Sequence, residues 1–360
     1  MLLMESQSGW SVLPVYRHTG LSPQLSALAN QGIYFPNFIP AGSGTIGAMN
    51  TIITGLTDID MNINYERSAL TPYPFGLAIN MKYLGYKTRF FYGGFLGWQR
   101  LDTFAKNQGF DEIYGCGNMS GGVRTNEWGV HDKDLYDYIL KTMDDDTPSF
   151  NFILTTSNHP PYDLNLQELG CPIKELPLPL KATKAETMVV LGHHWYADQQ
   201  AGRFVKEVER RFTTPMFAIT GDHTERLQIA FPGDSVVEQI AVPLILYGPK
   251  VLPESGVIKT TAGAHQDIPA TLIELAAEPG YRYPTFGENM LAKPSPSFGY
   301  GWQFIIGETF IANDGIPHNV FGLASASRPE AKPDLGEVRT RFNALKALSW
   351  YRVKKGPTLH

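Results

Sequence analysis

Short apolar runs recur along the chain and alternate with segments of helical periodicity. Five runs are almost continuously apolar and predict buried strands over 1–5, 88–94, 149–157, 216–222 and 243–249. Strands that are apolar on both faces are typical of a parallel sheet covered by helices on both sides. Between them, apolar residues recur every three to four positions, which predicts helices over 22–32, 74–85, 134–143, 194–212 and 267–276. The alternation predicts an α/β fold with a mostly parallel central sheet and helices on both faces.

The pattern changes after about residue 295. Residues 301–315 predict an antiparallel hairpin, and residues 336–352 predict a closing amphipathic helix. We therefore expect a large α/β domain over 1–295 and a smaller C-terminal α+β subdomain over 296–360, packed on the same core. The proline- and leucine-rich stretch 160–190 predicts a loop over the surface.

Composition narrows the class of protein. With 43% hydrophobic and 18% charged residues, the 360-residue chain has a globular composition, and a net charge of -5 without a lysine or arginine cluster argues against a nucleic-acid partner. No apolar run reaches the roughly 18 residues of a membrane-spanning helix. The chain opens directly on what reads as the middle of a strand, so we expect a segment upstream to be absent. Cys116 and Cys171 are too few for a disulfide framework, and they either pair or stay free.

The stretch AGSGTIGAMNTIITGL, residues 41–56, places a threonine directly behind Gly-Ser-Gly. Helical periodicity begins at Ile46 and stops at Gly55, so Thr45 is expected at or next to the N-cap of a helix. The small residues 41–44 are expected to clear space around its hydroxyl. Two interpretations remain: Thr45 caps the helix after a flexible turn, or it is a nucleophile at an anion-binding helix end.

Polar residues follow several predicted strands directly. Glu5 ends the first strand, and the pair Asp222-His223 ends the fourth. Because ligands of open α/β sheets gather outside the carboxyl ends of the strands, we expect these residues to meet Thr45 at one edge. Glu5, Thr45, Asp222 and His223 would then form a site for one divalent ion, Mn²⁺ or Zn²⁺, with Mg²⁺ as a further candidate. The alternative for Glu5 is a solvated residue at a strand end.

Further candidates lie beside the same edge. Tyr92, Trp98 and Arg100 follow the strand 88–94, and His159 follows the strand 149–157 in the segment SNHPPY. A tryptophan and an arginine after a glycine-rich strand end suit an anionic substrate, although both residues could simply pack on the surface. His159 could donate to a phosphate oxygen or protonate a leaving alcohol, or it could cap a turn before the prolines.

Four further histidines stand at or near the starts of predicted helices. His265 precedes a helix and either faces the site or caps that helix. His131 is expected to belong to a helix start. His193 and His194 are expected on the surface at the beginning of a helix.

Taken together, AGSGTIGAMNTIITGL, WQR, TTSNHPPY and AITGDHTE resemble the alkaline phosphatase and sulfatase superfamily. The similarity covers roughly residues 1–290 and is strongest to its lipoteichoic acid synthase and phosphoglycerol transferase branch, which is called sulfatase-like. The resemblance implies that Glu5, Thr45, Asp222 and His223 hold the metal and that Thr45 is the nucleophile. It also implies substrate contacts from the residues that match its motifs, namely His159, Trp98 and Arg100. The chain lacks the Cys/Ser-x-Pro-x-Arg motif of true sulfatases, which argues against sulfate ester hydrolysis, and Tyr92 stands where the synthases have a histidine.

The resemblance implies transfer of a phosphoglycerol- or phosphoethanolamine-like group through a phosphothreonine. The donor would be a phospholipid or another phosphodiester, and the acceptor would be a glycan or a lipid. Alternatives are a phosphodiesterase or phosphatase, and a non-catalytic binding module of the same fold. The expected location is the cell envelope, on the periplasmic or extracellular face of the cytoplasmic membrane, with membrane association only through segments absent from this chain. A second metal ion is expected to be absent or weakly bound, since His159 and His265 have no convincing carboxylate partner.

Overall fold

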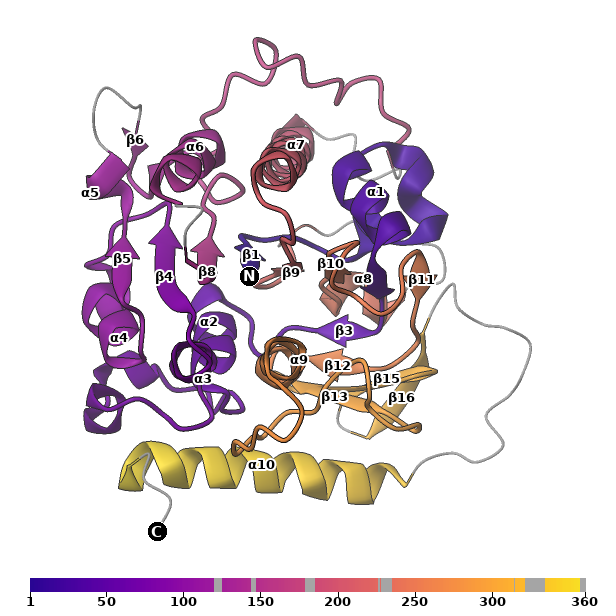
Figure 1. Cartoon of the computed structure of the whole chain (residues 1–360). Helices are drawn as coiled ribbons and strands as arrows, with labels where there is room; N and C mark the ends of the chain where they lie inside the picture. The colour runs from indigo at the N-terminus through magenta and orange to yellow at the C-terminus, as the bar shows by residue number, and fades with distance from the viewer. Residues whose placement is uncertain are drawn as a thin grey trace.

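A central sheet of eight strands organises the molecule (Figure 1). The computed structural model describes residues 1–119, 125–143, 147–178, 185–225, 227, 235–313, 315–320 and 334–356. The strand order is β11-β2-β10-β9-β1-β8-β4-β5. The bounds along that order are Val257–Ile258, Ile33–Phe35, Leu244–Tyr247, Phe217–Gly221, Leu2–Met4, Ser149–Leu154, Lys87–Tyr92 and Glu112–Tyr114.

Most strand pairs in this sheet are parallel, which confirms the predicted fold class. The exception is β10, which runs antiparallel to both β9 and β2. The strand β1 lies in the middle, between β9 and β8. The carboxyl ends of these three strands therefore emerge next to one another, where Glu5 and Asp222 follow them.

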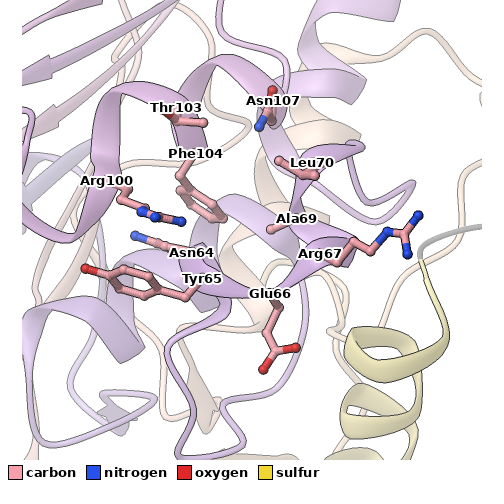
Figure 2. Close-up of a pocket in the computed structure, with 10 residues that line it drawn as sticks. All are labelled: Asn64, Tyr65, Glu66, Arg67, Ala69, Leu70, Arg100, Thr103, Phe104 and Asn107. Atoms are coloured by element: carbon pink, nitrogen blue, oxygen red, sulfur yellow. The ribbon is translucent and has the colours of Figure 1, made fainter.

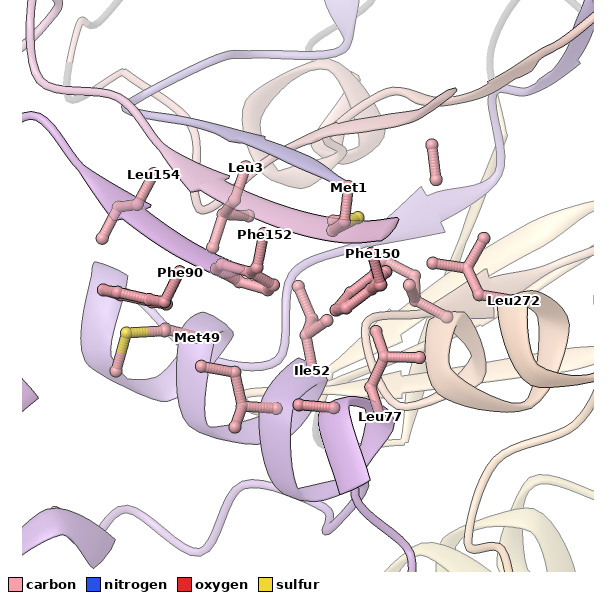
Figure 3. Packing of buried hydrophobic residues seen from close by; sticks show 14 of the residues in the cluster. Met1, Leu3, Met49, Ile52, Leu77, Phe90, Phe150, Phe152, Leu154 and Leu272 are labelled. Atoms are coloured by element: carbon pink, nitrogen blue, oxygen red, sulfur yellow. The ribbon is translucent and has the colours of Figure 1, made fainter. Parts of the chain in front are cut away.

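Both faces of the sheet are buried, which explains the nearly continuous apolar runs. Leu3 faces one side with Phe90 and Phe152, as Figure 3 shows. Leu2 and Ile153 face the other side. A strand that is buried on both faces cannot alternate apolar with polar residues, since each face would then bury polar groups.

Helices cover each face of the sheet (Figure 1). The side of Leu3 is covered by α2, α3, α4 and α9, whose bounds are Thr45–Thr54, Leu77–Tyr83, Leu101–Asn107 and Asp267–Ala276. The other side is covered by α1, α6 and α7, whose bounds are Pro23–Gln31, Asp132–Thr142 and Ala185–Arg211. Short elements complete this part: α5 and α8 at Cys116–Met119 and Val236–Ile240, and the ribbon β6–β7 at Thr125–Asn126 and Gly129–Val130.

The helix α7 begins earlier than the sequence predicts, so the expectation for two histidines was wrong. His193 and His194 lie within α7 and are fully buried instead of exposed at its start. The Nε2 atom of His194 lies 3.0–3.1 Å from side-chain atoms of Gln7, Ser11 and Ser22. His193 accepts a hydrogen bond at Nε2 from the backbone N–H of Leu164. Partners distant in sequence therefore replace the water that both imidazoles were expected to contact.

The C-terminal part forms an antiparallel sheet of four strands, of which the predicted hairpin is the middle. The strands β13 to β16 span Phe298–Gly301, Phe304–Gly307, Phe310–Asn313 and Ile316–Asn319. Ile306 and Ile311 pack against Ile39 and Ala264, which belong to the short pair β3 and β12 at Phe38–Ile39 and Gly263–Ala264. The helix α10, Leu335–Lys355, closes the molecule along one side (Figure 1). Its Val353 reaches the main core.

Cys116 and Cys171 are both free thiols. The predicted loop 160–190 is irregular up to residue 178, and α7 occupies its end from Ala185, while residues 179–184 lie outside the described part. Within the described residues, no helix has the length and apolar character that crossing a membrane requires.

The start of α1 depends on a carboxylate from α7. The backbone N–H groups of Gln24 and Leu25 donate to Asp198 at 3.0 and 2.8 Å, and the N-cap Ser22 provides no side-chain cap. Asp198→Ala should lower the free energy of unfolding by about 2–4 kcal/mol, because two N–H groups lose their acceptor. Asp198→Asn keeps one strong acceptor and should lose less. Urea denaturation measures both, and a loss below about 1 kcal/mol in the alanine variant would contradict this role.

Candidate active site

Thr45 is the first residue of α2, as the spacing of the sequence predicts. Its N-cap Gly44 has extended backbone angles, and no side chain caps the helix. The N–H groups of the first turn have no partner within the helix, and the positive end of the helix dipole lies there. Thr45 itself is half-buried. Its hydroxyl therefore stands beside donors that an anion can use.

The structure explains why small residues stand before and after Thr45, which the sequence alone did not show. A Cβ atom added at Gly42 or Gly47 would lie 2.8 or 3.1 Å from Oδ2 of Asp58. The two glycines thus make room for the Asp58 carboxylate behind the turn that carries Thr45. Burial raises the pKa of the Asp58 carboxyl to about 6.

The turn after β1 places Glu5 and binds the end of β9. Ser6 adopts a left-handed conformation with φ 50°. Its backbone N–H donates to Oδ1 of Asp222 at 2.8 Å, and its hydroxyl donates to Oε1 of Glu5 at 2.8 Å. The side-chain amide of Asn158 donates to the Ser6 carbonyl at 3.1 Å. Ser6, whose left-handed backbone is held by these three hydrogen bonds, therefore brings the carboxylates of Glu5 and Asp222 close together.

Glu5, Asp222, His223 and Thr45 converge at the carboxyl ends of β1 and β9. The Nε2 atom of His223 lies 3.6 Å from Oε1 of Glu5 and 3.5 Å from Oδ2 of Asp222. The Thr45 hydroxyl donates to Oε2 of Glu5 at 3.3 Å. Nδ1 of His223 lies 2.9 Å from the carbonyl of Thr224; donation at Nδ1 leaves the lone pair of Nε2 directed at the carboxylates.

Aromatic rings surround the opening above Thr45. The opening is lined by Glu5, Thr45, Tyr92, Trp98, Trp128, Thr156 and His159. The rings of Trp128 and His159 have centroids 4.0 Å apart, and Trp98 lies 6.0 Å from Tyr92. Burial, together with the charge of Glu5, raises the pKa of the Tyr92 phenol. The structure thus brings Tyr92, Trp98 and His159 to Thr45, as the sequence analysis expected.

Trp128 and Thr156 also line the opening, and the sequence analysis missed both. Trp128 lies in the turn of the ribbon β6–β7, and a bridge between Gly94 and Gly129 binds this ribbon to the end of β4. A Cβ at Gly129 would lie 2.0 Å from the carbonyl oxygen of Gly93. The glycine next to Trp128 was the available signal, since it permits this close backbone approach.

Arg100 does not line this opening. Its guanidinium lies 4.9 Å from the centre of the Tyr65 ring, in a neighbouring cavity (Figure 2). The structure therefore separates Trp98 and Arg100, which the sequence analysis had placed on one substrate. Gln99 and Arg100 both have positive φ angles, and this turn directs the two side chains to different cavities.

His265 is fully buried and stands behind the site. Its Nδ1 atom accepts from the N–H of Ala41 at 3.2 Å, and its Nε2 atom donates to the carbonyl of Gly221 at 2.9 Å. Burial lowers the pKa of His265 to about 4, so the ring is neutral at pH 7. The ring thus joins the segment before Thr45 to the strand end before Asp222, and the structure does not bring it to the opening. His131, in turn, is the N-cap residue of α6, as expected for a helix start.

The Sulfatase family model matches residues 1–278. The chain belongs to the sulfatase family. This sulfatase-family chain is 24% identical over 270 residues to phosphoglycerol transferase I of Escherichia coli (strain UTI89 / UPEC). That alignment covers 64% of this chain and 35% of the relative, so the chain spans only a part of the length of such relatives.

Solved structures show the same fold. The lipoteichoic acid synthase LtaP of Listeria monocytogenes superposes with a TM-score of 0.79 at 16% identity, covering 100% of this chain and 92% of that one. An alkaline phosphatase superfamily protein of Vibrio parahaemolyticus gives 0.74 at 20% identity, covering 98% and 86%. The sulfatase-family chain is therefore similar in sequence to a phosphoglycerol transferase and similar in fold to a lipoteichoic acid synthase.

The residues of this sulfatase-family site fit a divalent metal ion. Glu5, Asp222 and His223 each offer one ligand atom, and these atoms lie within 4.8 Å of one another. Oδ2 of Asp222 is buried and has no hydrogen-bond partner among the described residues. Burial, and then the charge of Asp222, raise the pKa of Glu5 well above its usual range. Two buried carboxylates are costly unless a cation compensates them, and carboxylate oxygen with imidazole nitrogen suits Zn²⁺ or Mn²⁺.

Proposed function

We propose that this chain is a metal-dependent transferase that works through a phosphothreonine. It would move a phosphoglycerol- or phosphoethanolamine-like group from a phospholipid or other phosphodiester to a glycan or lipid acceptor. The observation that carries the proposal is the Thr45 hydroxyl, which stands at an uncapped helix start and donates to Glu5 in the aromatic-lined opening. The similarity to phosphoglycerol transferase I supports the choice of group.

In the first half-reaction, Oγ1 of Thr45 attacks phosphorus while its proton passes to Oε2 of Glu5. The bond between phosphorus and the leaving alcohol breaks, and His159 protonates that alcohol. N–H groups in the first turn of α2 donate to the non-bridging oxygens. A single divalent ion held by Glu5, Thr45, Asp222 and His223 would supply positive charge next to the hydroxyl and the phosphoryl group.

In the second half-reaction, His159 accepts the proton of an acceptor alcohol, whose oxygen attacks the phosphothreonine. The bond between phosphorus and Oγ1 breaks, and Thr45 recovers its proton from Glu5. The half-buried His159 lies at the opening beside Trp128, where an incoming alcohol can reach it. Each group thus returns to its starting state after one turnover.

His159→Ala should reduce kcat with a phospholipid donor by about 10²–10⁴-fold, the usual contribution of a general acid or base. A donor with a p-nitrophenolate leaving group needs little protonation, so formation of the phosphothreonine from it should be much less affected. Steady-state and burst kinetics with both donors measure this difference. His18→Ala, at an exposed histidine, is the control. An equal loss with both donors would assign His159 to substrate binding alone.

Hydrolysis is the second candidate, because the half-buried Thr45 leaves a phosphothreonine within reach of water. The two candidates differ in the acceptor. We would incubate the metal-loaded protein with vesicles of head-group-labelled phosphatidylglycerol and increasing amounts of an oligosaccharide. The proposal predicts that label on the sugar rises while free glycerol phosphate falls. Label released only to water at every sugar concentration would identify a phosphodiesterase.

We further propose that the reaction takes place at the cell envelope, on the outer face of the cytoplasmic membrane. Lipid head groups and envelope glycans are both accessible there. Residues 1–295 would form the catalytic domain and residues 296–360 a subdomain on the same core, which the packing of Ile306 and Ile311 against Ile39 supports.

A further inference from the structure

A second cavity lies beside the opening (Figure 2). Its walls are the 3₁₀ turns Ile63–Tyr65 and Arg67–Leu70, together with Arg100 and the helix α4. The residues that line it are Asn64, Tyr65, Glu66, Arg67, Ala69, Leu70, Arg100, Thr103, Phe104 and Asn107. Trp98 lines the opening and Arg100 lines this cavity, and both belong to the turn Trp98–Arg100. The two spaces are therefore neighbours separated by one turn of chain.

Asn64 provides an unused hydrogen-bond acceptor at the wall of the cavity. The side chain is 8% exposed, and its Nδ2 donates to the carbonyl of Gln99 at 2.7 Å. Its Oδ1 is buried and has no hydrogen-bond partner among the described residues. Buried acceptors in folded proteins nearly always have a donor. A ligand that enters this cavity can supply that donor.

Tyr65 provides an aromatic surface at the mouth. The residue is 55% exposed, and the guanidinium of Arg100 lies over its ring, 4.9 Å from the ring centre. Phe104 and Leu70 add apolar surface, and Thr103 and Asn107 add polar groups from α4. An exposed ring next to planar amide and guanidinium groups suits a ligand with an apolar face and a polar edge.

The charges at the cavity exclude one class of ligand and leave two. Glu66 is paired with Lys354 at 2.7 Å, whereas Arg67 and Arg100 have no carboxylate partner among the described residues. A cation is therefore disfavoured. A phosphate would suit the arginines, but the phosphate group of a diester carries no donor for Oδ1 of Asn64. A sugar hydroxyl can donate to Oδ1 and accept from Arg100.

We propose that this cavity binds one sugar unit of the acceptor glycan, with the sugar ring on Tyr65 and a hydroxyl on Oδ1 of Asn64. The proposal deepens the proposed function and rests on it, since it names the acceptor as a carbohydrate. Because only the turn 98–100 separates the cavity from the opening, a glycan seated here can extend its next unit toward Thr45.

The test measures sugar binding without turnover, by saturation-transfer NMR on the metal-loaded protein with cellobiose and gentiobiose as probes. Wild type should bind at least one of them. Tyr65→Ser should weaken that binding by about tenfold, since it removes the ring surface, and Tyr65→Phe should retain it. Tyr83→Ser is the matched control, because Tyr83 is 71% exposed on α3 and does not line the cavity.

Three results would overturn the proposal: neither disaccharide binds wild type, Tyr65→Ser binds as tightly as wild type, or inorganic phosphate displaces the sugar from Tyr65. The last result would identify an anion site. Cleavage of bis(p-nitrophenyl) phosphate is measured on the same samples and should be unchanged in the control Tyr83→Ser. Sugar binding that fails while this cleavage continues refutes only the sugar site. Sugar binding without any cleavage refutes the proposed function instead.

Discussion

Thr45→Ala is expected to reduce turnover by roughly 10³–10⁶-fold while the fold remains intact. Alanine has no oxygen that can form the covalent intermediate, and Thr45 is the residue lining the opening whose hydroxyl donates to Glu5. Thr156, the other threonine that lines the opening, donates its hydroxyl to the carbonyl of Val130 at 2.7 Å. The loss should fall on kcat, and release of diacylglycerol from labelled vesicles measures it.

The stability of Thr45→Ala separates a chemical role from a structural one. Gly44, not Thr45, is the N-cap of α2, and the Thr45 side chain does not cap the helix. The free energy of unfolding should therefore change by less than about 1 kcal/mol, the usual value of a cap. Thr45→Ser keeps the hydroxyl and should retain part of the activity. Near-normal turnover in Thr45→Ala would mean that water attacks the donor directly.

Asp222→Asn is expected to lower metal affinity by more than about 100-fold. Replacing a residue that only hydrogen-bonds to a metal ligand already lowers metal affinity by about 10–100-fold. Asp222 is itself proposed as a ligand, so its loss should cost more. Asparagine can still accept through Oδ1 from the N–H groups of Ser6 and His223, so the turn should survive. Competition with a zinc-binding dye and elemental analysis measure the affinity.

A matched control exists for this variant. Glu225 is a buried acid close by in the sequence, but it accepts from the indole N–H of Trp10 at 2.6 Å and does not belong to the metal cluster. Glu225→Gln should leave metal affinity unchanged. Without metal, Asp222→Asn should be at least as stable as wild type, since it removes one of two neighbouring buried carboxylates. Equal metal affinity in Asp222→Asn and Glu225→Gln would refute the assignment of Asp222.

The sequence predicts those parts of the fold that depend on burial alone. Strands such as Ser149–Leu154 are buried on both faces in their second half, so their apolar runs can be recognised without knowing any partner. The same reasoning places Glu5, Asp222 and His223 at one edge, since residues that directly follow parallel strands must emerge together. These positions need only the order of strands and helices.

The residues that the sequence could not place depend on contacts between distant segments. Ser6 matters because its N–H meets Asp222, and Trp128 reaches the opening because Gly129 meets Gly93. His194 is buried because three side chains from the first turns surround it. Local periodicity contains none of this information.

The position of the Arg100 side chain could not be predicted from the sequence either. Arg100 is separated from Trp98 because the backbone at Gln99 and Arg100 is left-handed. Neither residue type predicts that conformation. The Trp-x-Arg spacing suggested one shared substrate contact. The structure instead divides the pair between two neighbouring cavities.

The most direct test of the central claim is the mass of the Thr45 peptide after exposure to phosphatidylglycerol vesicles without acceptor. The metal-loaded protein would be quenched in acid and digested, and the peptide analysed by mass spectrometry. The account predicts a phosphoglycerol adduct on Thr45 that forms with an equal amount of diacylglycerol and disappears when acceptor is added. Continued release of diacylglycerol from the vesicles while Thr45 stays unmodified would contradict it.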